Sequence, residues 1–353
     1  MLERLWTRKM LSPGDLAPVR DNTQVVGTFN PGVAAWKEGV VAVVRVVEEV
    51  TETRDGSYAS PRMEADGSMA IDWLNAKDCD TSDPRLYVNR HDGSLRLRFI
   101  SHLKVLFSSD GQTFDSFDGP AIMPQGDYET FGIEDPRITC INGMYYITYV
   151  AVSPHGVVTC LLSTTDFVSF RRHGIIFCPD NKDVVLFPEK IVGNYVAMHR
   201  PIPAMKFGTP RIWLAQSNDL IHWGAHTQLL NGDGHNSERL GGGTPPILTE
   251  RGWLTLYHGN EKIAPAPDGT QQVRYTAGAL LLDAQNPRKI VGHAAQPVMV
   301  PVEPFETQGF VDQVVFPTAV VEHEEQLRVY YGAADEHVGV ASFDKEALLA
   351  CLA

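Results

Sequence analysis

Asp166-Phe-Val-Ser-Phe170 is one of three stretches in which an aspartate is followed four positions later by an aromatic residue. The others are Asp110-Gly-Gln-Thr-Phe114 and Asp219-Leu-Ile-His-Trp223, which places the three aspartates 56 and 53 residues apart. A serine stands within the three positions before each of them. Weaker echoes at Asp283-Ala-Gln-Asn-Pro287 and Ser342-Phe-Asp344 continue a period of about 60 residues. Such a period indicates one structural unit used several times.

The segments before these turns also resemble one another, because each turn follows an apolar strand, a loop and a second apolar strand. Four strands carry similar residues: Tyr145-Tyr-Ile-Thr-Tyr149, Tyr195-Val-Ala-Met-His199, Trp253-Leu-Thr-Leu-Tyr257 and Leu327-Arg-Val-Tyr-Tyr331. Repeats of this length, built from short strands with little helical periodicity, are typical of β-propellers, whose four-stranded blades surround a channel. A sandwich with a second domain would not explain the near-constant spacing. The sequence therefore predicts an all-β, five-bladed β-propeller.

We expect one domain over residues 1–353, with short terminal extensions. Residues 24–32 read as a loop that feeds a buried strand at 39–47, and residues 51–82 form a polar, turn-rich excursion before strands resume at 95–100. Helix is expected only near each end of the chain, as at 345–352.

Composition sets further bounds. With 353 residues, 43% of them hydrophobic and 21% charged, the chain can bury a large core. Its net charge of -13 argues against a nucleic-acid surface. Neither an apolar leader nor a run of 18 apolar residues is apparent, so we expect a cytoplasmic protein without a membrane span. The oligomeric state stays open, a homo-oligomer included.

The spacing of cysteines and histidines argues against a disulfide framework and against a metal site. The five cysteines form no Cys-x-x-Cys pair and sit mostly in apolar runs, which predicts buried free thiols. The twelve histidines show no ligand-like spacing. We therefore expect no metal and no cofactor.

The stretch Phe131-Gly-Ile-Glu-Asp-Pro-Arg137 carries the best candidate for a catalytic acid. Because a residue before proline is pushed away from the right-handed α region, Asp135 is held on a stiff backbone in an extended or turn conformation, beside a residue without an amide hydrogen. An Asx-type turn that opens the next strand is the structural alternative.

Polar residues that interrupt apolar strands are the candidates for a channel lining. Each alone has a structural explanation, as a paired arginine, a satisfied core histidine or a turn acid. Several of them end the similar strands of successive repeats, as a shared ring would require. The candidates are Asn30, Arg45, Asp135, Lys182, His199, Arg200, Arg239, His258 and Asp335.

Acids and cations around one channel suggest glycosyl transfer. Inverting glycoside cleavage needs an acid that protonates the leaving oxygen and a nucleophile on the opposite face of the sugar. A hydrolase activates water with a second carboxylate, whereas phosphorolysis uses inorganic phosphate, which needs no base and calls for Lys, Arg and His.

Seven motifs together resemble glycoside hydrolase family 130, the β-mannoside phosphorylases and β-1,2-mannosidases. The resemblance runs from about Phe29 to Phe343, and the family is a five-bladed propeller. The motifs are Phe29-Asn-Pro-Gly32, Gly132-Ile-Glu-Asp-Pro-Arg137, Asn181-Lys-Asp-Val-Val-Leu-Phe-Pro-Glu-Lys190, His199-Arg-Pro201, Gly241-Gly-Gly-Thr-Pro-Pro246, Tyr257-His-Gly259 and Tyr330-Tyr-Gly-Ala-Ala-Asp335.

The resemblance implies a role for each candidate. Asp135 is the general acid, whose proton passes through a hydroxyl of the bound mannose. Mannose in the cleaved subsite is held by Asn30, Arg45 and Asp335. Phosphate is bound by Lys182, Arg200, Arg239 and His258. Lys182 stands where some members have arginine and Arg239 where lysine is usual, so the charge is kept while the hydrogen-bond geometry changes.

The retained basic set favours an inverting phosphorylase that cleaves a β-1,2- or β-1,4-mannoside with phosphate to give α-mannose 1-phosphate. Its partners are then a mannose-containing oligosaccharide and phosphate, and residues 51–82 and 259–274 are expected to border the acceptor side. An inverting β-1,2-mannosidase using water is the alternative, with Glu238 as a conceivable base that reads better as a solvated loop acid. A propeller that binds sugars or a protein without chemistry is the third interpretation.

Overall fold

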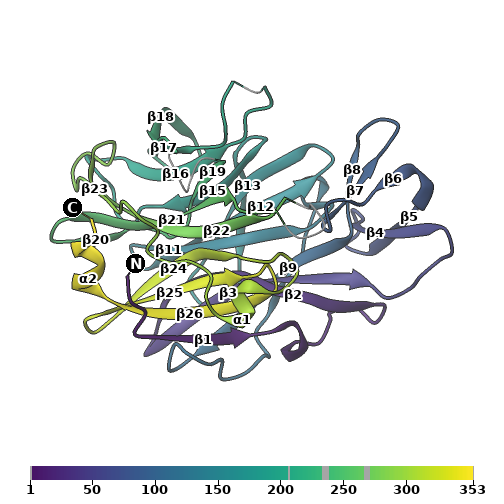
Figure 1. Ribbon diagram of the computed structural model, residues 1–353, viewed down its shortest axis with the longest axis horizontal. Helices are drawn as coiled ribbons and strands as arrows, with labels where there is room; N and C mark the ends of the chain where they lie inside the picture. The colour runs from purple at the N-terminus through teal and green to yellow at the C-terminus, as the bar shows by residue number, and fades with distance from the viewer. Residues whose placement is uncertain (1, 206, 233–237, 266–270, 353) are drawn as a thin grey trace.

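Antiparallel strands dominate the computed structural model, which describes residues 2–205, 207–232, 238–265 and 271–352 (Figure 1). The all-β prediction is confirmed. Five main sheets follow one another along the chain, and each consists of strands that are mostly consecutive in sequence. Short helices are confined to η1 (Pro13–Asp15), η2 (Ala76–Asp78), η3 (Asp127–Glu129), α1 (Pro304–Thr307) and α2 (Lys345–Ala350).

We number the main sheets 1 to 5 in chain order. Sheet 1 contains β2 (Thr23–Trp36), β3 (Gly39–Val50), β9 (Phe99–Ser108) and β10 (Ala121–Ile122). Sheet 2 contains β11 (Ile133–Ile141), β12 (Met144–Ser153), β13 (Gly156–Thr164) and β14 (Arg171–Phe177). Sheet 3 contains β15 (Asn181–Leu186), β16 (Tyr195–Pro201), β17 (Ile212–Ser217) and β18 (Trp223–Leu230).

The last two main sheets depart slightly from this plan. Sheet 4 contains β19 (Arg239–Gly242), β21 (Gly252–Lys262), β22 (Val273–Leu282) and β23 (Ile290–His293), with β20 (Ile247–Thr249) paired to β21. Sheet 5 contains β24 (Val315–His323), β25 (Gln326–Ala333), β26 (His337–Asp344) and, as its fourth strand, β1 (Trp6–Leu11) from the other end of the chain. The four similar strands seen in the sequence belong to β12, β16, β21 and β25, which stand next to the first strand in sheets 2 to 5.

The repeated Asp-x-x-x-aromatic turn joins the third and fourth strands of a sheet. In each case one aspartate oxygen accepts hydrogen bonds from the backbone amides two and three residues later, at 2.7 to 3.0 Å, which closes the turn. The four turns of this kind begin at Asp110, Asp166, Asp219 and, in the weaker echo, Asp283. A hydroxyl two residues earlier supports the first three; it is Thr164 rather than a serine before Asp166.

Hydrophobic clusters fill the space between successive sheets. One lies between sheets 1 and 2, and others follow between sheets 2 and 3, 3 and 4, and 4 and 5. A fifth cluster, which includes Val44 of β3 and Val340 of β26, joins sheet 5 to sheet 1. Each main sheet therefore packs against two others.

Two predictions about the first 36 residues need correction. Near the N-terminus β1 pairs with the edge of β26, and the one helix among the described residues there is the single 3-10 turn η1. Residues 24–32 belong to strand β2, not to a loop. A β-bulge between Phe29 and Gly32 admits Asn30 and Pro31 without ending the strand. At the other end of the chain, α2 confirms the predicted helix.

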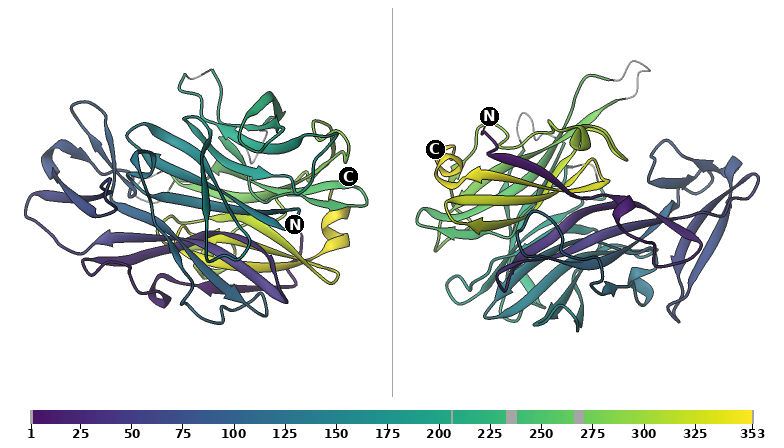
Figure 2. Two further views of the ribbon diagram at one scale, coloured as in Figure 1. Left: turned by 180° about the vertical axis from the view of Figure 1, so that it is seen from behind. Right: turned by 90° about the horizontal axis from the view of Figure 1, so that it is seen from below.

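The polar excursion forms an arm of two small sheets and is longer than predicted, since β9 begins only at Phe99. Its strands are β4 (Ser57–Met63), β5 (Met69–Asn75), β6 (Cys79–Asp80), β7 (Leu86–Asn89) and β8 (Leu95–Leu97). Figure 2 shows the arm at the end of the molecule opposite α2 and the two termini. Tyr58 of β4 stacks on Tyr87 of β7 with ring centroids 4.9 Å apart, which ties the two small sheets together.

All five cysteines are free, but the prediction that most are buried is wrong. Cys79 and Cys160 are buried, whereas Cys140, Cys178 and Cys351 are exposed. Cys140 lies in β11, where alternate residues face opposite sides of the sheet, while Cys178 directly follows β14 and Cys351 directly follows α2. Within the described ranges, no helix has the length and apolar character to cross a membrane.

Candidate functional site

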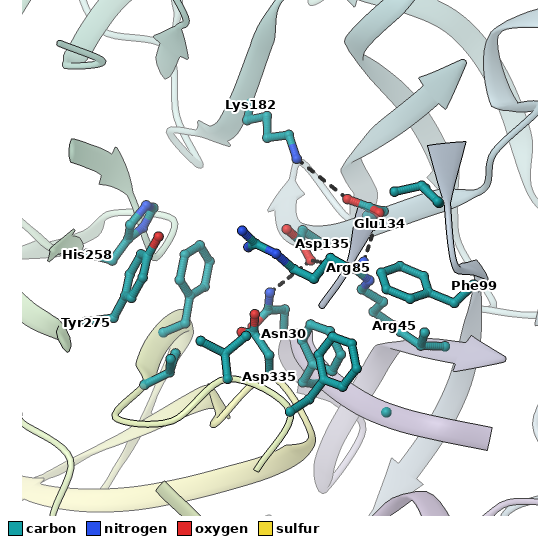
Figure 3. Close-up of a pocket in the computed structure, with 18 of the residues that line it drawn as sticks. Asn30, Arg45, Arg85, Phe99, Glu134, Asp135, Lys182, His258, Tyr275 and Asp335 are labelled. Carbon is teal, nitrogen blue, oxygen red and sulfur yellow. Dashed lines mark hydrogen bonds and ion pairs between the residues drawn. The ribbon is translucent and has the colours of Figure 1, made fainter. Parts of the chain in front are cut away.

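All eight residues to which a role was assigned line one cavity of about 400 Å³ (Figure 3). These are Asn30, Arg45, Asp135, Lys182, Arg200, Arg239, His258 and Asp335. They come from sheets 1 to 5, so residues far apart in sequence meet at one place. His199 is the exception among the channel candidates. It lies on the opposite face of β16 from Arg200, where its ring nitrogens contact Asn181 and His226 and it stacks on Phe177.

The first strand of each of sheets 1, 2 and 3 contains a β-bulge, and each bulge carries one residue that lines the cavity. Asn30 of β2, Asp135 of β11 and Asp183 of β15 have φ angles of 47°, 50° and 55° and stand where the strand register shifts. Asparagine and aspartate adopt this left-handed conformation more readily than other non-glycine residues. The expectation of an extended or turn backbone at Asp135 is thereby replaced by a left-handed bulge residue.

The Asp135 carboxylate is buried and held from two sides. Its Oδ1 accepts hydrogen bonds from Asn30 Nδ2 at 2.9 Å and from Arg45 Nη1 at 3.1 Å. Burial alone would raise the pKa of Asp135, but the positive charges of Arg45, Arg137 and Lys182 outweigh it and hold the pKa below its ordinary value. With these partners alone, the carboxyl is ionised at neutral pH.

A second carboxylate, Glu134, connects the acid to one of the predicted phosphate ligands. Arg45 Nη2 donates to Glu134 Oε1 at 2.8 Å, and Lys182 Nζ lies 3.6 Å from Glu134 Oε2. Arg45 also packs over the ring of Phe29, with its guanidinium carbon 4.7 Å from the ring centroid. Lys182 therefore contacts the acid side of the cavity, which its sequence position did not reveal.

The basic cluster surrounds a carboxylate that the sequence analysis did not select. Asp183 Oδ2 lies 2.9 Å from Arg200 Nε and 3.3 Å from His258 Nε2, and its Oδ1 lies 3.6 Å from Arg137 Nη2. Burial would raise the pKa of Asp183, but Arg200, His258 and Arg137 hold it far below its ordinary value. Burial also lowers the pKa of His258, against the effect of the carboxylate.

Arg239 lines the cavity but is exposed, while the neighbouring acid Glu238 does not line it. The Glu238 side chain is 43% exposed, and its nearest recorded partner is Lys262 Nζ at 3.6 Å. This agrees with the reading of Glu238 as a solvated acid. The preceding residues 233–237, and residues 266–270 of the predicted acceptor loop, lie outside the described part of the chain.

The arm contributes Arg85 to the cavity, opposite Asp335. Arg85 is oriented by a two-pronged ion pair with Asp83, at 2.9 and 2.8 Å, and Figure 3 shows its guanidinium in the middle of the site. Burial raises the pKa of Asp335 to about 6, the charges of Asp135 and Glu134 add to the rise, and Arg85 and Arg45 oppose it. The arm thus supplies a cation to the carboxylate side of the site.

Aromatic rings complete the wall. Phe29, Phe99, Phe310, Phe316 and Tyr275 all line the cavity, and Phe316 stacks on the His258 imidazole with centroids 4.0 Å apart. Flat apolar surfaces beside hydrogen-bonding groups suit the faces and hydroxyls of a sugar ring. No cluster of three or more His, Cys, Asp or Glu side chains suited to a metal occurs among the residues that the structure describes.

Sequence reasoning missed several cavity residues for different reasons. Glu134 and Asp183 stood inside quoted motifs, and a comparison of the three bulges would have selected Asp183 beside Asn30 and Asp135. Arg85 and Asp83 lie in the arm, outside the repeat, so the period could not place them. Tyr275 looked like an ordinary strand residue of β22.

The raised pKa of Asp335 predicts a pH-dependent cost to stability. Between about pH 4 and pH 6 the folded protein binds a proton at Asp335 that the unfolded chain has lost, so this group destabilises the fold as pH rises through that window. Asp335→Asn removes the effect. The variant should match the wild type below pH 4 and gain about 1–2 kcal/mol over it above pH 6, a value discounted for partial exposure. Urea unfolding of both proteins from pH 4 to 8 measures this, and a pH-independent difference would contradict it.

Comparison with known proteins agrees with this geometry. Residues 84–353 match the glycoside hydrolase family 130 profile, described as β-1,4-mannooligosaccharide phosphorylase. A β-1,2-mannobiose phosphorylase from Listeria innocua is 36% identical, with 92% of this chain and 91% of that protein covered. A 1,2-β-oligomannan phosphorylase from Thermoanaerobacter is 35% identical, with 69% of this chain and 79% of that protein covered.

A solved structure is also similar over nearly the whole chain. The Listeria innocua β-1,2-mannobiose phosphorylase, in complex with β-1,2-mannobiose, superposes with a TM-score of 0.89 at 33% identity. The match covers 98% of this chain and 99% of that one. The similarity therefore includes the arm.

Proposed function

Because the chain belongs to glycoside hydrolase family 130, we propose that it cleaves β-mannosides with inorganic phosphate and releases α-mannose 1-phosphate with inversion. It is an enzyme of the glycoside phosphorylase class, as its curated relatives are. The observation that carries the proposal is the single cavity in which a buried carboxyl on one side faces a cluster of cations on the other.

Asp135 is the proposed general acid. In the reaction the bond between the anomeric carbon and the leaving oxygen breaks, a phosphate oxygen bonds to the anomeric carbon from the opposite face, and the proton of Asp135 ends on the leaving oxygen, relayed by a mannose hydroxyl. Asn30, Arg45 and Asp335 are the proposed mannose ligands. Asn30 and Arg45 also fix the Asp135 carboxyl, so sugar placement and acid placement depend on the same side chains.

Phosphate binding favours the protonated acid. The positive charges near Asp135 keep it ionised, and a phosphate anion in the same cavity offsets those charges. Phosphate would be held by Arg200, His258, Lys182 and Arg239. The nucleophile thereby promotes the protonation state that the leaving group requires.

Hydrolysis is the weaker alternative, because the carboxylates of Asp183 and Glu134 are already engaged by basic side chains. A general base must be free to take a proton from water, but Asp183 is neutralised by Arg200, His258 and Arg137, and Glu134 is paired with Arg45 and Lys182. The cations that would have to be replaced by glutamate in a hydrolase are all present. This supports phosphate as the nucleophile.

The finer architecture belongs to the same proposal. We propose that sheets 1 to 5 are the blades of one five-bladed propeller and that residues 1–353 form one domain. Supporting this, a hydrophobic cluster lies between every pair of successive sheets, including sheets 5 and 1. The eight residues with proposed roles come from the first and second strands of the sheets, or closely follow them, as a shared central site requires.

The substrate is proposed to be a β-1,2-linked mannoside, as in the names of the relatives that cover most of the chain, with a β-1,4 linkage as the second candidate. We propose a cytoplasmic enzyme, because phosphorolysis consumes inorganic phosphate and the five cysteines are free thiols. We also propose that it uses no cofactor.

Incubation of the enzyme with β-1,2-mannobiose or β-1,4-mannosyl-glucose, with and without phosphate, tests the activity. We expect mannose 1-phosphate only when phosphate is present, and faster release from β-1,2-mannobiose; proton and phosphorus NMR identify the α anomer. Equal release of free mannose with and without phosphate would assign the chain to hydrolysis instead.

A further inference from the structure

The feature that the proposed chemistry leaves unused is the buried carboxylate of Asp183. It is 2% exposed, stands in the left-handed bulge of β15 and lines the cavity among the proposed phosphate ligands. A negative charge inside an anion site should weaken anion binding unless it does something else there. The contacts of Asp183 indicate what its carboxylate does in this site.

Asp183 is the anchor of two proposed phosphate ligands. Within the described ranges it is the one recorded polar partner of the Arg200 side chain, bound at Nε, so both Nη groups stay available to a ligand. The same oxygen, Oδ2, holds Nε2 of His258, whose ring is fixed from its face by Phe316. One carboxylate oxygen therefore sets the directions of a guanidinium and an imidazole.

The opposite strand leaves room for this pair. Gly241 of β19 is the register partner of His258, and a Cβ on Gly241 would collide with Asp183 Oδ2 and with His258 Cε1 and Nε2. Gly241 does not have a positive φ, so the backbone itself would accept alanine. The absence of a side chain at position 241 thus serves the Asp183–His258 contact rather than a turn.

Arg137 connects the Asp183 anchor to the acid. Its Nη2 lies 3.6 Å from Asp183 Oδ1, and its Nη1 donates to the backbone carbonyl of Asp135 at 2.8 Å. Arg137 is 1% exposed and is not among the cavity-lining residues, so it acts through its neighbours. Arg137 thereby fixes the position of the bulge at Asp183 relative to the bulge at Asp135.

We propose that Asp183 is the positioning residue of the phosphate site: its carboxylate orients Arg200 and His258 toward the cavity and, through Arg137, fixes that pair relative to the acid. This inference rests on the proposed function. It assigns to Asp183 no contact with the reacting atoms. It also accounts for the negative charge, because a pre-oriented pair of donors binds phosphate better than a looser, more positive one.

Asp183→Asn tests the role at nearly constant shape, since asparagine also accepts the left-handed backbone. The amide would turn a donor toward either Arg137 or the Arg200–His258 pair. We expect the KM for phosphate to rise at least about tenfold, because the contacts at 2.9 and 3.3 Å that orient Arg200 and His258 lose the carboxylate charge, with the KM for mannobiose changed less than about twofold. The control is Asp118→Asn, an exposed acid before β10, which should leave both values unchanged.

A double-mutant cycle with Arg200→Ala separates positioning from general loosening. Because the carboxylate acts through Arg200, the phosphate effect of Asp183→Asn should shrink at least threefold once Arg200 is absent. Additive effects on the phosphate KM would overturn the proposal, as would equal changes in both KM values.

Gly241→Ala keeps the inference testable if Asp183→Asn does not fold. The added Cβ pushes the side chains of Asp183 and His258 apart without changing either residue. The variant should therefore also raise the phosphate KM at least about tenfold. Gly224→Ala is the matched control, since Gly224 of β18 has no atom within 4 Å of the position a Cβ would occupy. Unchanged phosphate affinity in Gly241→Ala would overturn the proposal.

Calorimetric titration with inorganic phosphate alone separates this inference from the proposed function. If the wild type binds phosphate and Asp183→Asn binds it at least tenfold more weakly, the positioning role stands whatever the product analysis shows. If the wild type makes mannose 1-phosphate but both proteins bind phosphate equally, the proposed function stands and the role of Asp183 falls.

Discussion

Asp135→Asn should lower kcat on β-1,2-mannobiose by about 10³-fold while leaving the fold and sugar affinity nearly unchanged. Protonation of a leaving group by a positioned acid is worth about 10² to 10⁴ in rate, and an amide cannot supply that proton. Asparagine keeps an oxygen that can accept from Asn30 and Arg45, and it tolerates a φ of 50°. The loss should therefore be chemical rather than structural.

The leaving group provides the internal control for Asp135→Asn. A 4-nitrophenyl β-mannoside leaves as a stabilised anion and needs little protonation, so the variant should lose far less activity on it than on mannobiose. Thermal unfolding and mannose binding, measured by calorimetry, check that the site is intact. Near wild-type turnover of mannobiose, or equal losses on both substrates, would remove Asp135 from the role of general acid.

Arg200→Ala should raise the KM for phosphate by about 10²-fold, and the KM for mannobiose only a few-fold. A charge-assisted hydrogen bond is worth about 1.5–3 kcal/mol, and removing Arg200 also leaves the buried Asp183 carboxylate without its nearest partner at 2.9 Å. That uncompensated charge would repel phosphate from the same cavity. Steady-state kinetics with each substrate varied in turn measures the split.

Two companion variants make the Arg200→Ala result specific. Arg200→Lys keeps the charge but not the guanidinium geometry, so it should recover only part of the phosphate affinity. Arg171→Ala removes an exposed arginine of β14 and should change neither KM. Equal effects of Arg200→Ala on both substrates would argue against a phosphate role, and the variant should also unfold at lower temperature because a buried ion pair is broken.

Most of the fold that could be predicted from the sequence was predicted from the repeated turn. A turn whose aspartate binds two backbone amides is a local device, so the pattern at Asp110, Asp166 and Asp219 marked the same corner of each sheet. Because strands follow one another within each sheet, the order of the elements also followed. The residues at the ends of similar strands, such as Arg200 and His258, could then be placed in one cavity.

What the sequence could not show depends on long-range pairing and on the backbone. The bulge at Asn30 made a strand look like a loop, since Asn-Pro-Gly is a turn sequence unless a partner strand holds it. Asp183 looked like an ordinary neighbour of Lys182, because its burial and its contacts with Arg200, His258 and Arg137 arise only when sheets 2, 3 and 4 meet. Arg85 reaches the site from the arm, which has no counterpart in the other repeats.

The pairing of β1 with β26 determines the order in which parts of the fold can be completed during synthesis. Trp6 leaves the ribosome long before its partner Ser342, which lies more than three hundred residues later in the chain, has been synthesised. Until then β1 remains an unpaired strand, and sheet 5 lacks its outer edge. Asp335 lies in the connection between two strands of that sheet. The side of the cavity that is proposed to hold the sugar is therefore completed after the bulges that carry Asn30, Asp135 and Asp183 have had time to form.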